Sequence, residues 1–223
     1  MLRPRITPCL LVHKGGLVKT VGFKAPKYVG DPINAVKIFN EKESDELIVL
    51  DIDASVNASE PDYQMIQNLA AECRMPLCYG GGVKTAEQAS RIVGLGVEKV
   101  AVSSAAVANP QLVSEISEQI GRQSIVVVID IHRKMFGRGY EVMTHNGKKS
   151  AKRDPFAFAA EMAALGAGEI VLNSIDNDGQ MQGYDLEAAV ALRAAVNIPI
   201  TVLGGAGSLA DMKTLFDQCG VVG

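Results

Sequence analysis

The run Ile48-Val49-Leu50 occurs again as Ile170-Val171-Leu172, 122 positions further along the chain. The pair Gly81-Gly82 likewise occurs again as Gly204-Gly205, at an offset of 123. Each run marks the end of an expected strand, and the order of the two is the same in both places. The sequence therefore indicates an internal repeat of about half the chain.

A third pair of segments fits the same repeat. Residues 11–14, Leu-Val-His-Lys, align with residues 130–133, Asp-Ile-His-Arg, at an offset of 119. We therefore predict two half-barrels, roughly 1–120 and 121–223, each with four strand–helix pairs.

Short apolar runs alternate with longer amphipathic stretches along the whole chain. The expected strands are 6–12, 47–50, 76–78, 99–102, 124–129, 169–172 and 199–203. The expected helices are 31–42, 63–71, 86–95, 110–120, 155–165, 186–196 and 209–217. Apolar strands that are each followed by a helix indicate a parallel sheet buried on both faces. Because a doubly wound sheet gives no reason for a twofold repeat, we predict one α/β domain, a (βα)₈ TIM barrel over 1–223.

Residues 220–223, Gly-Val-Val-Gly, resemble the start of an eighth strand. A barrel needs its eighth strand to remove the open edges of the sheet. We therefore expect the eighth strand and helix to be largely missing from this chain.

Composition excludes several classes of protein. The 223 residues are 48% hydrophobic and 21% charged, with a formal net charge of −3, which is ordinary for a globular chain and unlike a disordered one. This charge gives no reason to expect a nucleic-acid or membrane partner, and no apolar run is long enough to span a bilayer. The four cysteines have no C-x-x-C spacing, so we expect reduced thiols in a cytoplasmic protein.

The two glycine runs give the clearest indication of a ligand. Gly80-Gly81-Gly82 and Gly204-Gly205-Ala206-Gly207 each follow a strand, and each precedes a residue, Thr85 or Ser208, suited to cap the next helix. Glycines let the backbone approach a ligand, and the amides of a helix N-terminus bind phosphate. A tight turn alone would explain one run. Two runs at matching places favour a ligand with a phosphate at each end.

Four carboxylates are expected near the ends of barrel strands: Asp51, Asp130, Asp176 and Asp178. Such a group can act as a general acid or base, although a helix cap or an ion pair is the commoner role of a single aspartate. The histidines lack metal-ligand spacing, so we expect neither a metal nor a cofactor. The basic run at 147–153 is interpreted as a solvated loop.

Over nearly its whole length the chain resembles the cyclase subunit family of imidazole glycerol phosphate synthase. The resemblance is carried by Arg5-Ile6, Pro8-Cys9-Leu10, Val18-Lys19, Gly30-Asp31-Pro32, Leu50-Asp51-Ile52, Gly80-Gly81-Gly82, Ser104-Ala105-Ala106-Val107, Gly166-Ala167-Gly168-Glu169-Ile170, Asp178-Gly179, Gly183-Tyr184-Asp185 and Gly204-Gly205-Ala206-Gly207. It implies a barrel that takes ammonia from a glutaminase partner docked at the N-terminal face. The ammonia would react with a bisphosphorylated ribulosyl-formimino substrate to give imidazole glycerol phosphate and an aminoimidazole carboxamide ribotide.

The resemblance also implies roles for individual residues. Asp130 would be one catalytic carboxylate, and Lys19 would reach the substrate from the first loop. The expected substrate- and phosphate-binding residues are Asp51, Gly82, Ser103, Ser104, Asn146, Asp178, Gly179 and Gly205. Arg5, Glu46, Lys99 and Glu169 would form a ring of alternating charges at the ammonia entrance, for which a purely stabilising network is the alternative.

One position departs from the family pattern. In the family, the other catalytic carboxylate ends the first strand. This chain has Leu11 there, at the position that aligns with Asp130 in the internal repeat. Leucine can neither donate nor accept a proton, and acid–base catalysis contributes about 10²–10⁴-fold to rate. The chain therefore most resembles paralogues associated with glycosyl amidation in surface-polysaccharide (O-antigen or lipopolysaccharide) synthesis.

Two alternatives remain open. The chain could be an active cyclase of histidine biosynthesis whose missing acid is supplied by Asp51 or Asp176. It could also be a sugar-phosphate isomerase of the same half-barrel ancestry, although that reaction too needs carboxylates on the first and fifth strands.

Overall fold

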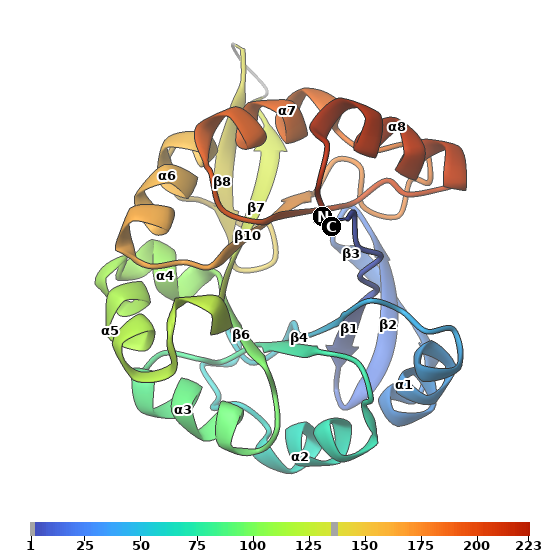
Figure 1. The fold of residues 1–223 in the computed structure, drawn as a ribbon, viewed down its shortest axis with the longest axis vertical. Helices are drawn as coiled ribbons and strands as arrows, with labels where there is room; N and C mark the ends of the chain where they lie inside the picture. Colours follow the sequence, from blue (N-terminus) through green and yellow to red (C-terminus); the bar gives the residue numbers. More distant parts are fainter. Residues whose placement is uncertain (1–2, 135–137) are drawn as a thin grey trace.

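The computed structural model describes residues 3–134 and 138–223, which form a ring of strands surrounded by helices (Figure 1). The strands are β1 (Cys9–His13), β2 (Gly16–Val21), β3 (Lys24–Gly30), β4 (Leu47–Asp51), β5 (Leu77–Gly80), β6 (Lys99–Val102), β7 (Ile125–Arg133), β8 (Tyr140–Thr144), β9 (Lys149–Ser150), β10 (Glu169–Ser174) and β11 (Ile200–Leu203). The helices are α1 (Pro32–Glu41), α2 (Tyr63–Glu72), α3 (Ala86–Gly94), α4 (Ser104–Ala108), α5 (Gln111–Ile120), α6 (Pro155–Leu165), α7 (Leu186–Ala195) and α8 (Leu209–Cys219), with a short 3₁₀ turn at Arg122–Ser124.

Seven of the strands in the described residues are parallel neighbours, in the order β1-β4-β5-β6-β7-β10-β11. They match the seven expected strands, and the helices between them lie on the outside of the ring (Figure 1). The fold is that of a (βα)₈ barrel, as predicted.

The last residues of the chain lie between β11 and the segment that precedes β1. The backbone of Gly223 exchanges hydrogen bonds of 2.9 and 3.0 Å with β11, and the amide of Arg5 donates to the carbonyl of Val222 at 3.0 Å. Residues 221–223 therefore take the position of an eighth strand. Figure 1 shows the two ends of the chain side by side at this place.

Two antiparallel hairpins were not among the expected elements. Strands β2 and β3 continue from β1, and β8 and β9 continue from β7, so the repeat extends to these additions. The prediction of a loop over 147–153 is wrong at Lys149–Ser150, which form β9. Strand β3 is exposed over nearly its whole length, so it lacks the apolar run by which a buried strand is found.

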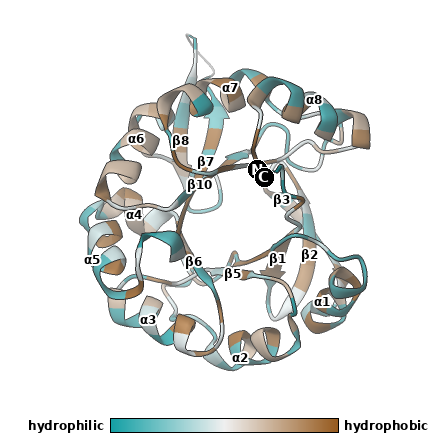
Figure 2. Ribbon diagram, in the orientation of Figure 1, coloured by the Kyte–Doolittle hydropathy of each residue, from teal (hydrophilic) through white to brown (hydrophobic). Residues whose placement is uncertain are grey.

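Apolar side chains fill the fold in two layers. A large cluster packs the outer side of the sheet against the helices, which carry both hydrophobic and hydrophilic residues (Figure 2). A second cluster fills the barrel interior and contains Ile48, Cys78, Ala101, Val126, Val128 and Val171, with Cys9, Leu50 and Leu203 beside it. This division follows from the period of two in a strand, which sends alternate side chains inward and outward.

Two predicted helix caps are confirmed. The Thr85 hydroxyl accepts the amide of Gln88 at 3.2 Å, and the Gln88 side chain accepts the Thr85 amide in return. Ser208 accepts the amide of Asp211 at the start of α8. Each cap fixes the direction in which the chain leaves a glycine run.

Candidate functional site

A cavity of about 270 Å³ lies at the C-terminal ends of the parallel strands. This is the end of a barrel at which active sites are built. Most of the predicted site residues line it: Asp51, Gly82, Ser103, Ser104, Asp130, Asn146 and Asp178, together with Leu11.

Three predicted residues lie apart from this lining. Lys19 stands exposed on β2, opposite Lys27 of β3. Gly179 and Gly205 are not among the lining residues and lie in the loops that follow β10 and β11.

Asp130 is held on β7 by a hydrogen bond of 3.0 Å from the side-chain amide of Asn173 on β10. Burial raises the pKa of Asp130 to about 7. Hydrogen bonds from Asn173 and Ser103 stabilise the carboxylate and so keep this pKa from rising further. A carboxyl group with a pKa near 7 is present in both protonation states at neutral pH. It is therefore suited to exchange a proton with a ligand.

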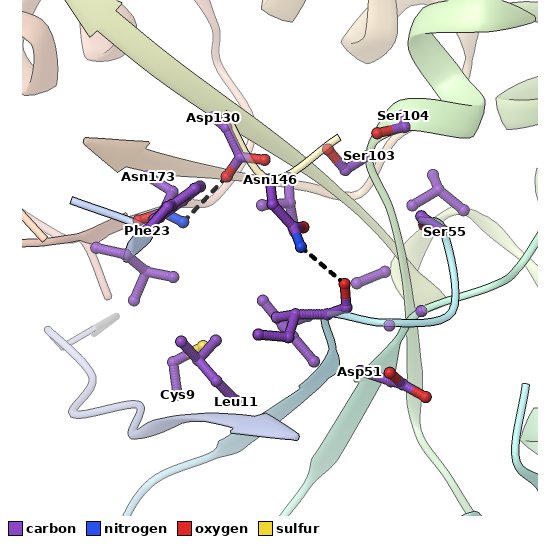
Figure 3. Close-up of a pocket in the computed structure, with 18 of the residues that line it drawn as sticks. Cys9, Leu11, Phe23, Asp51, Ser55, Ser103, Ser104, Asp130, Asn146 and Asn173 are labelled. Carbon is purple, nitrogen blue, oxygen red and sulfur yellow. Dashed lines mark hydrogen bonds between the residues drawn. The ribbon is translucent and has the colours of Figure 1, made fainter. Parts of the chain in front are cut away.

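The wall across from Asp130 is apolar. Figure 3 shows Cys9 and Leu11, both on β1, on the far side of the cavity from Asp130 and Asn173. Leu11 holds the position in the first half-barrel that Asp130 holds in the second. The cavity thus has a proton-exchanging group on one wall and none at the matching place.

The other two carboxylates of the lining hold loops in place. Asp51 accepts the amides of Asp53 and Ala54 at 2.8 and 3.2 Å, and burial raises its pKa. Asp178 accepts the Thr20 hydroxyl at 2.7 Å and the Phe23 amide at 3.1 Å. The Asp178 carboxylate therefore fastens the β2–β3 hairpin to the rim of the barrel.

Close packing accounts for the predicted glycines by itself. A Cβ atom at Gly82 would lie 2.9 Å from the carbonyl oxygen of Ser59, and one at Gly205 would lie 2.0 Å from that of Gly183. A Cβ at Gly179 would lie 2.3 Å from the carbonyl oxygen of Thr20. All three glycines also have positive φ. A tight turn is therefore enough to explain a glycine at each of these positions.

Asn146 joins the second hairpin to the first half of the barrel. Its side-chain amide donates to the carbonyl of Ile52 at 2.9 Å (Figure 3). The neighbouring amide of His145 donates to the Ser104 hydroxyl at 3.4 Å. These contacts place the tip of the β8–β9 hairpin over the cavity.

Asp176, a candidate acid in the sequence, is committed to another contact. Nδ1 of His132 lies 2.6 Å from Asp176, whose second oxygen accepts the amide of Arg133 at 2.8 Å. The first half repeats this arrangement with His13 and Asp53, at 2.7 Å. Both pairs brace the turn from a barrel strand into its hairpin.

The four residues predicted to form a charged ring meet at the opposite end of the barrel. Arg5 contacts Glu46 at 2.7 Å and Glu169 at 2.8 Å. Lys99 contacts the same two carboxylates at 3.0 and 2.9 Å. Each cation thus bridges both anions, and together they form a closed ring of alternating charge.

The ring has a fifth member that the sequence analysis missed. Thr201, buried on β11, donates its hydroxyl to Glu169 at 2.7 Å and accepts from Arg5 at 3.3 Å. Burial opposes ionisation of Glu169, but the hydrogen bond from Arg5 and the charge of Lys99 hold its pKa below the ordinary value. Alternation of inward and outward side chains along the expected strand 199–203 could have indicated that Thr201 faces inward. The same alternation, continued one residue beyond the expected strand 169–172, could have indicated Asn173.

The space between the ring and the cavity is apolar. It holds the interior cluster described above, with Cys9 and Leu203 at the floor of the cavity. A second cavity of about 200 Å³ is lined by Arg5 and Thr201 of the ring and by Cys9 and Leu203, and also by Met212, Leu215 and Phe216 of α8. It therefore lies between β1 and β11 and extends outside the ring of strands. Cys9, Leu203 and Gly204 line both cavities.

Three further features concern the residues that the structure describes. All four cysteines are free, and burial raises the pKa of Cys9 to about 12, so this thiol stays neutral. No group of three or more potential metal ligands is found in the described part of the chain. No helix there has the length and apolar character that a membrane crossing requires.

Comparison with known proteins gives consistent relatives. Residues 5–223 match the family model described as histidine biosynthesis protein. A Vibrio vulnificus (strain YJ016) protein, provisionally named imidazole glycerol phosphate synthase subunit hisF3, is 56% identical over 223 residues, which are 100% of this chain and 86% of that protein. The imidazole glycerol phosphate synthase subunit HisF of Streptomyces coelicolor (strain ATCC BAA-471 / A3(2) / M145) is 43% identical over 209 residues, covering 94% of this chain and 83% of that protein.

The matches span nearly the whole chain, and the barrel with its C-terminal cavity is the fold that the resemblance implied. The chain belongs to the histidine biosynthesis protein family and is a relative of the HisF subunits of imidazole glycerol phosphate synthase.

Proposed function

We propose that this chain is a HisF-like barrel subunit that receives ammonia from a glutaminase and conducts it through the barrel to a separate acceptor enzyme. The observation that carries the proposal is an ordered charge ring at one end of the barrel combined with Leu11 facing Asp130 at the other. The first feature suits ammonia passage, and the second removes half of the acid–base pair that cyclisation needs.

The passage is argued from charge and polarity. Neutral ammonia can cross an apolar interior, whereas an ammonium ion would lose its hydration there. The ring of Arg5, Glu46, Lys99 and Glu169 would admit ammonia and keep ions and bulk water out. A glutaminase docked on the N-terminal face would open onto this ring, as the resemblance implies.

The acceptor is argued from Leu11. With Leu11 in place of a second carboxylate, the cavity has no acid or base at the position equivalent to Asp130. We therefore propose that the ammonia serves sugar amidation in polysaccharide synthesis in the cytoplasm. The cavity, with Gly82, Ser103 and Ser104 at its rim, would hold a phosphorylated small molecule, and Gly179 and Gly205 would belong to the second phosphate site.

The alternative is an active cyclase and lyase of histidine biosynthesis, in which another group replaces the missing acid. Asp51 is the better of the two candidates, because it lines the cavity with a raised pKa, while Asp176 accepts the amide of Arg133 and is not among the residues that line the cavity. Turnover of the ribulosyl-formimino substrate with an added ammonium salt separates the two functions. We expect turnover at least about 10²-fold below that of a cyclase with both aspartates. Turnover within tenfold of that enzyme would establish the alternative.

The passage itself is tested through Lys99. In the reconstituted complex with glutaminase and acceptor enzyme, glutamate released and amidated product formed should stay near a ratio of one. The change Lys99→Ala leaves Glu46 and Glu169 without one of their two cations, so ammonia should escape and the ratio should rise severalfold. The matched control is Lys37→Ala on the outer helix α1, which should leave the ratio unchanged. A ratio that stays near one in Lys99→Ala would make the ring a structural network only.

A further inference from the structure

Half of the basic side chains of this acidic protein are concentrated in two short segments. Residues 14–30 and 132–153 together contain 11 of the 22 lysines and arginines but only one of the 25 acidic residues, Glu141. The remainder of the chain therefore carries 11 basic and 24 acidic side chains. Such a separation of charge directs which partners approach each face of a protein.

The described residues of these segments form the two hairpins on the C-terminal face. Strands β2 and β3 follow the end of β1, and β8 and β9 follow the end of β7; three strands, β4, β5 and β6, lie between β1 and β7 in the sheet. The hairpin tips approach one another, because a Cβ at Gly147 would lie 3.5 Å from the ring of Phe23. Lys24 and Lys148 are the chain neighbours of these two residues, so the fold brings like charges together beside the cavity mouth.

Most of these cations have no ionic partner. Among the described residues, Arg133 pairs with Asp185 and Glu187, and Arg153 pairs with Glu161. The other nine form no ion pair within the described parts of the chain, and all nine are exposed: Lys14, Lys19, Lys24, Lys27, Lys134, Arg138, Lys148, Lys149 and Lys152. The repulsion among them is left for an outside anion to relieve.

These cations lie outside the lining of the cavity. None of these cations is among the described residues that line the cavity, whose ionisable side chains are Cys9 and three aspartates. A lysine on a free sheet edge also prevents aggregation, which would explain Lys24 and Lys27 on β3. It does not explain Lys14, Lys148 and Lys152, which lie outside any strand.

Apolar groups accompany the charges on the first hairpin. Tyr28 is 67% exposed on β3, and Val21 and Val29 are about half exposed beside it. An exposed tyrosine within a charged rim is typical of surfaces that bind proteins.

We infer that the two hairpins form a docking surface, here called the basic rim, for an acidic face of the enzyme that consumes the ammonia. This inference rests on the proposed function, because the ammonia must leave the barrel at this mouth. A partner seated on the basic rim would cover the exit and keep ammonia out of bulk water. It would also neutralise the nine unpaired cations.

The binding test uses poly-L-glutamate of about 20 residues as the probe. The rim variant carries Lys24→Glu, Lys27→Glu and Lys148→Glu, and the control carries Lys37→Glu, Lys42→Glu and Lys213→Glu, three exposed lysines away from the hairpins. Both variants change the net charge equally. At low salt we expect the dissociation constant to rise at least about tenfold in the rim variant and less than about twofold in the control.

Three outcomes of this binding test would overturn the inference. Equal loss in both variants would show that only net charge matters. Tighter binding of a 20-nucleotide oligothymidylate would assign the basic rim to nucleic acid. Displacement of the probe by inorganic phosphate, at an ionic strength matched with chloride, would assign the cations to small phosphorylated ligands.

A coupled assay separates this inference from the proposed function. The assay uses the complex of this chain with the glutaminase and the sugar-amidating enzyme. In it, the rate of glutamine-dependent amidation should be at least about tenfold lower with the rim variant than with the wild-type chain. Amidation with an ammonium salt, which needs no docking, should be unchanged. If the wild-type chain gives no glutamine-dependent amidation, the proposed function fails, whatever the polyglutamate result. If it does and the rim variant equals it, the docking surface is wrong while the proposed function stands.

Discussion

Asp130 and Leu11 are equivalent positions in the two halves of the barrel, yet their environments have opposite chemical consequences. Asp130 is buried with Asn173 as its hydrogen-bond donor, and the cost of desolvating its charge raises its pKa to about 7. Leu11 adds its side chain to the apolar wall that faces it. The two equivalent positions thus give the cavity an ionisable group on one wall and an apolar group on the other.

The raised pKa of Asp130 makes stability depend on pH. In the unfolded chain the group titrates near 3.8, and in the folded chain near 7. Between these values the folded state binds the additional proton, so Asp130 lowers stability progressively as pH rises from about 4 to 7. The variant Asp130→Asn should therefore be more stable than the wild type at pH 8, by at most about 4 kcal/mol. This difference in the free energy of unfolding should be much smaller at pH 4. Urea unfolding of both proteins at the two pH values measures this, and parallel curves would contradict it.

Leu11→Asp tests the proposal that a carboxylate at this position is what the chain lacks for cyclase activity. The new side chain would face Asp130 across the cavity, beside Cys9 and Leu50. We expect it to lower stability by about 2 kcal/mol, because a carboxylate would be placed on an apolar wall. Turnover of the ribulosyl-formimino substrate with ammonium salt should rise by about 10²-fold. The control is Leu11→Asn, similar in shape, which should give no gain.

At the scale of the elements, glycine positions decide how closely loops can approach the barrel. The loop after β11 passes so near to the loop after β10 that a Cβ at Gly205 would meet the carbonyl of Gly183. Gly183 also donates its amide to the Gly205 carbonyl at 2.8 Å, so the contact cannot open without losing a hydrogen bond. Gly94, at the end of α3, has open space around its Cβ position and no positive φ.

The two glycines should therefore respond to alanine in opposite directions. Gly205→Ala should lower the free energy of unfolding by more than about 2 kcal/mol, from strain at φ +100° and from the close contact. Gly94→Ala should raise it by about 0.5–1 kcal/mol, because alanine loses less conformational entropy in a helix. Chemical denaturation of both variants provides the comparison. A neutral Gly205→Ala would show that the loop moves freely.

At the scale of the whole molecule, the charge ring ties the two halves of the barrel together. Arg5 and Glu46 come from the first half, Glu169 and Thr201 from the second, and Arg5 bonds to all of the other three. The basic rim differs at the other end, where nine of its eleven cations form no ion pair with the described residues. The molecule is thus electrostatically satisfied at one mouth and unsatisfied at the other.

Thr201→Val should weaken the ring while it keeps the shape of the side chain. Glu169 would lose the hydroxyl that donates to it at 2.7 Å, and we expect a loss of about 1–3 kcal/mol in stability. Thr214→Val on α8 is the control, because this exposed hydroxyl donates only within its own helix; it should change stability by less than about 0.5 kcal/mol. Thr201→Ser should restore most of the wild-type value, and equal stability of Thr201→Val and wild type would remove Thr201 from the ring.

The repeat as aligned from the sequence is one residue out of register at β4 and β10, because Ile48 faces the barrel interior as Val171 does, whereas Ile170 faces outward. The sequence by itself did determine the barrel, the existence of its twofold repeat, the caps at Thr85 and Ser208, and the leucine at position 11. These features are local or periodic, and apolar runs with short-range hydrogen bonds are visible along a chain. The sequence did not reveal the two hairpins, because β3 is exposed and β9 has only two residues, so neither carries a buried strand's pattern.

Only the tertiary structure decided which polar groups meet. Asn173 reaches Asp130, Thr201 joins the ring, and Asp178 holds the first hairpin from the opposite half of the chain. The pKa of Asp130 likewise depends on burial and on neighbours far away in sequence. Such contacts follow from the closure of the barrel, which brings the ends of distant strands to one place, and no pattern along the chain encodes the distances between them.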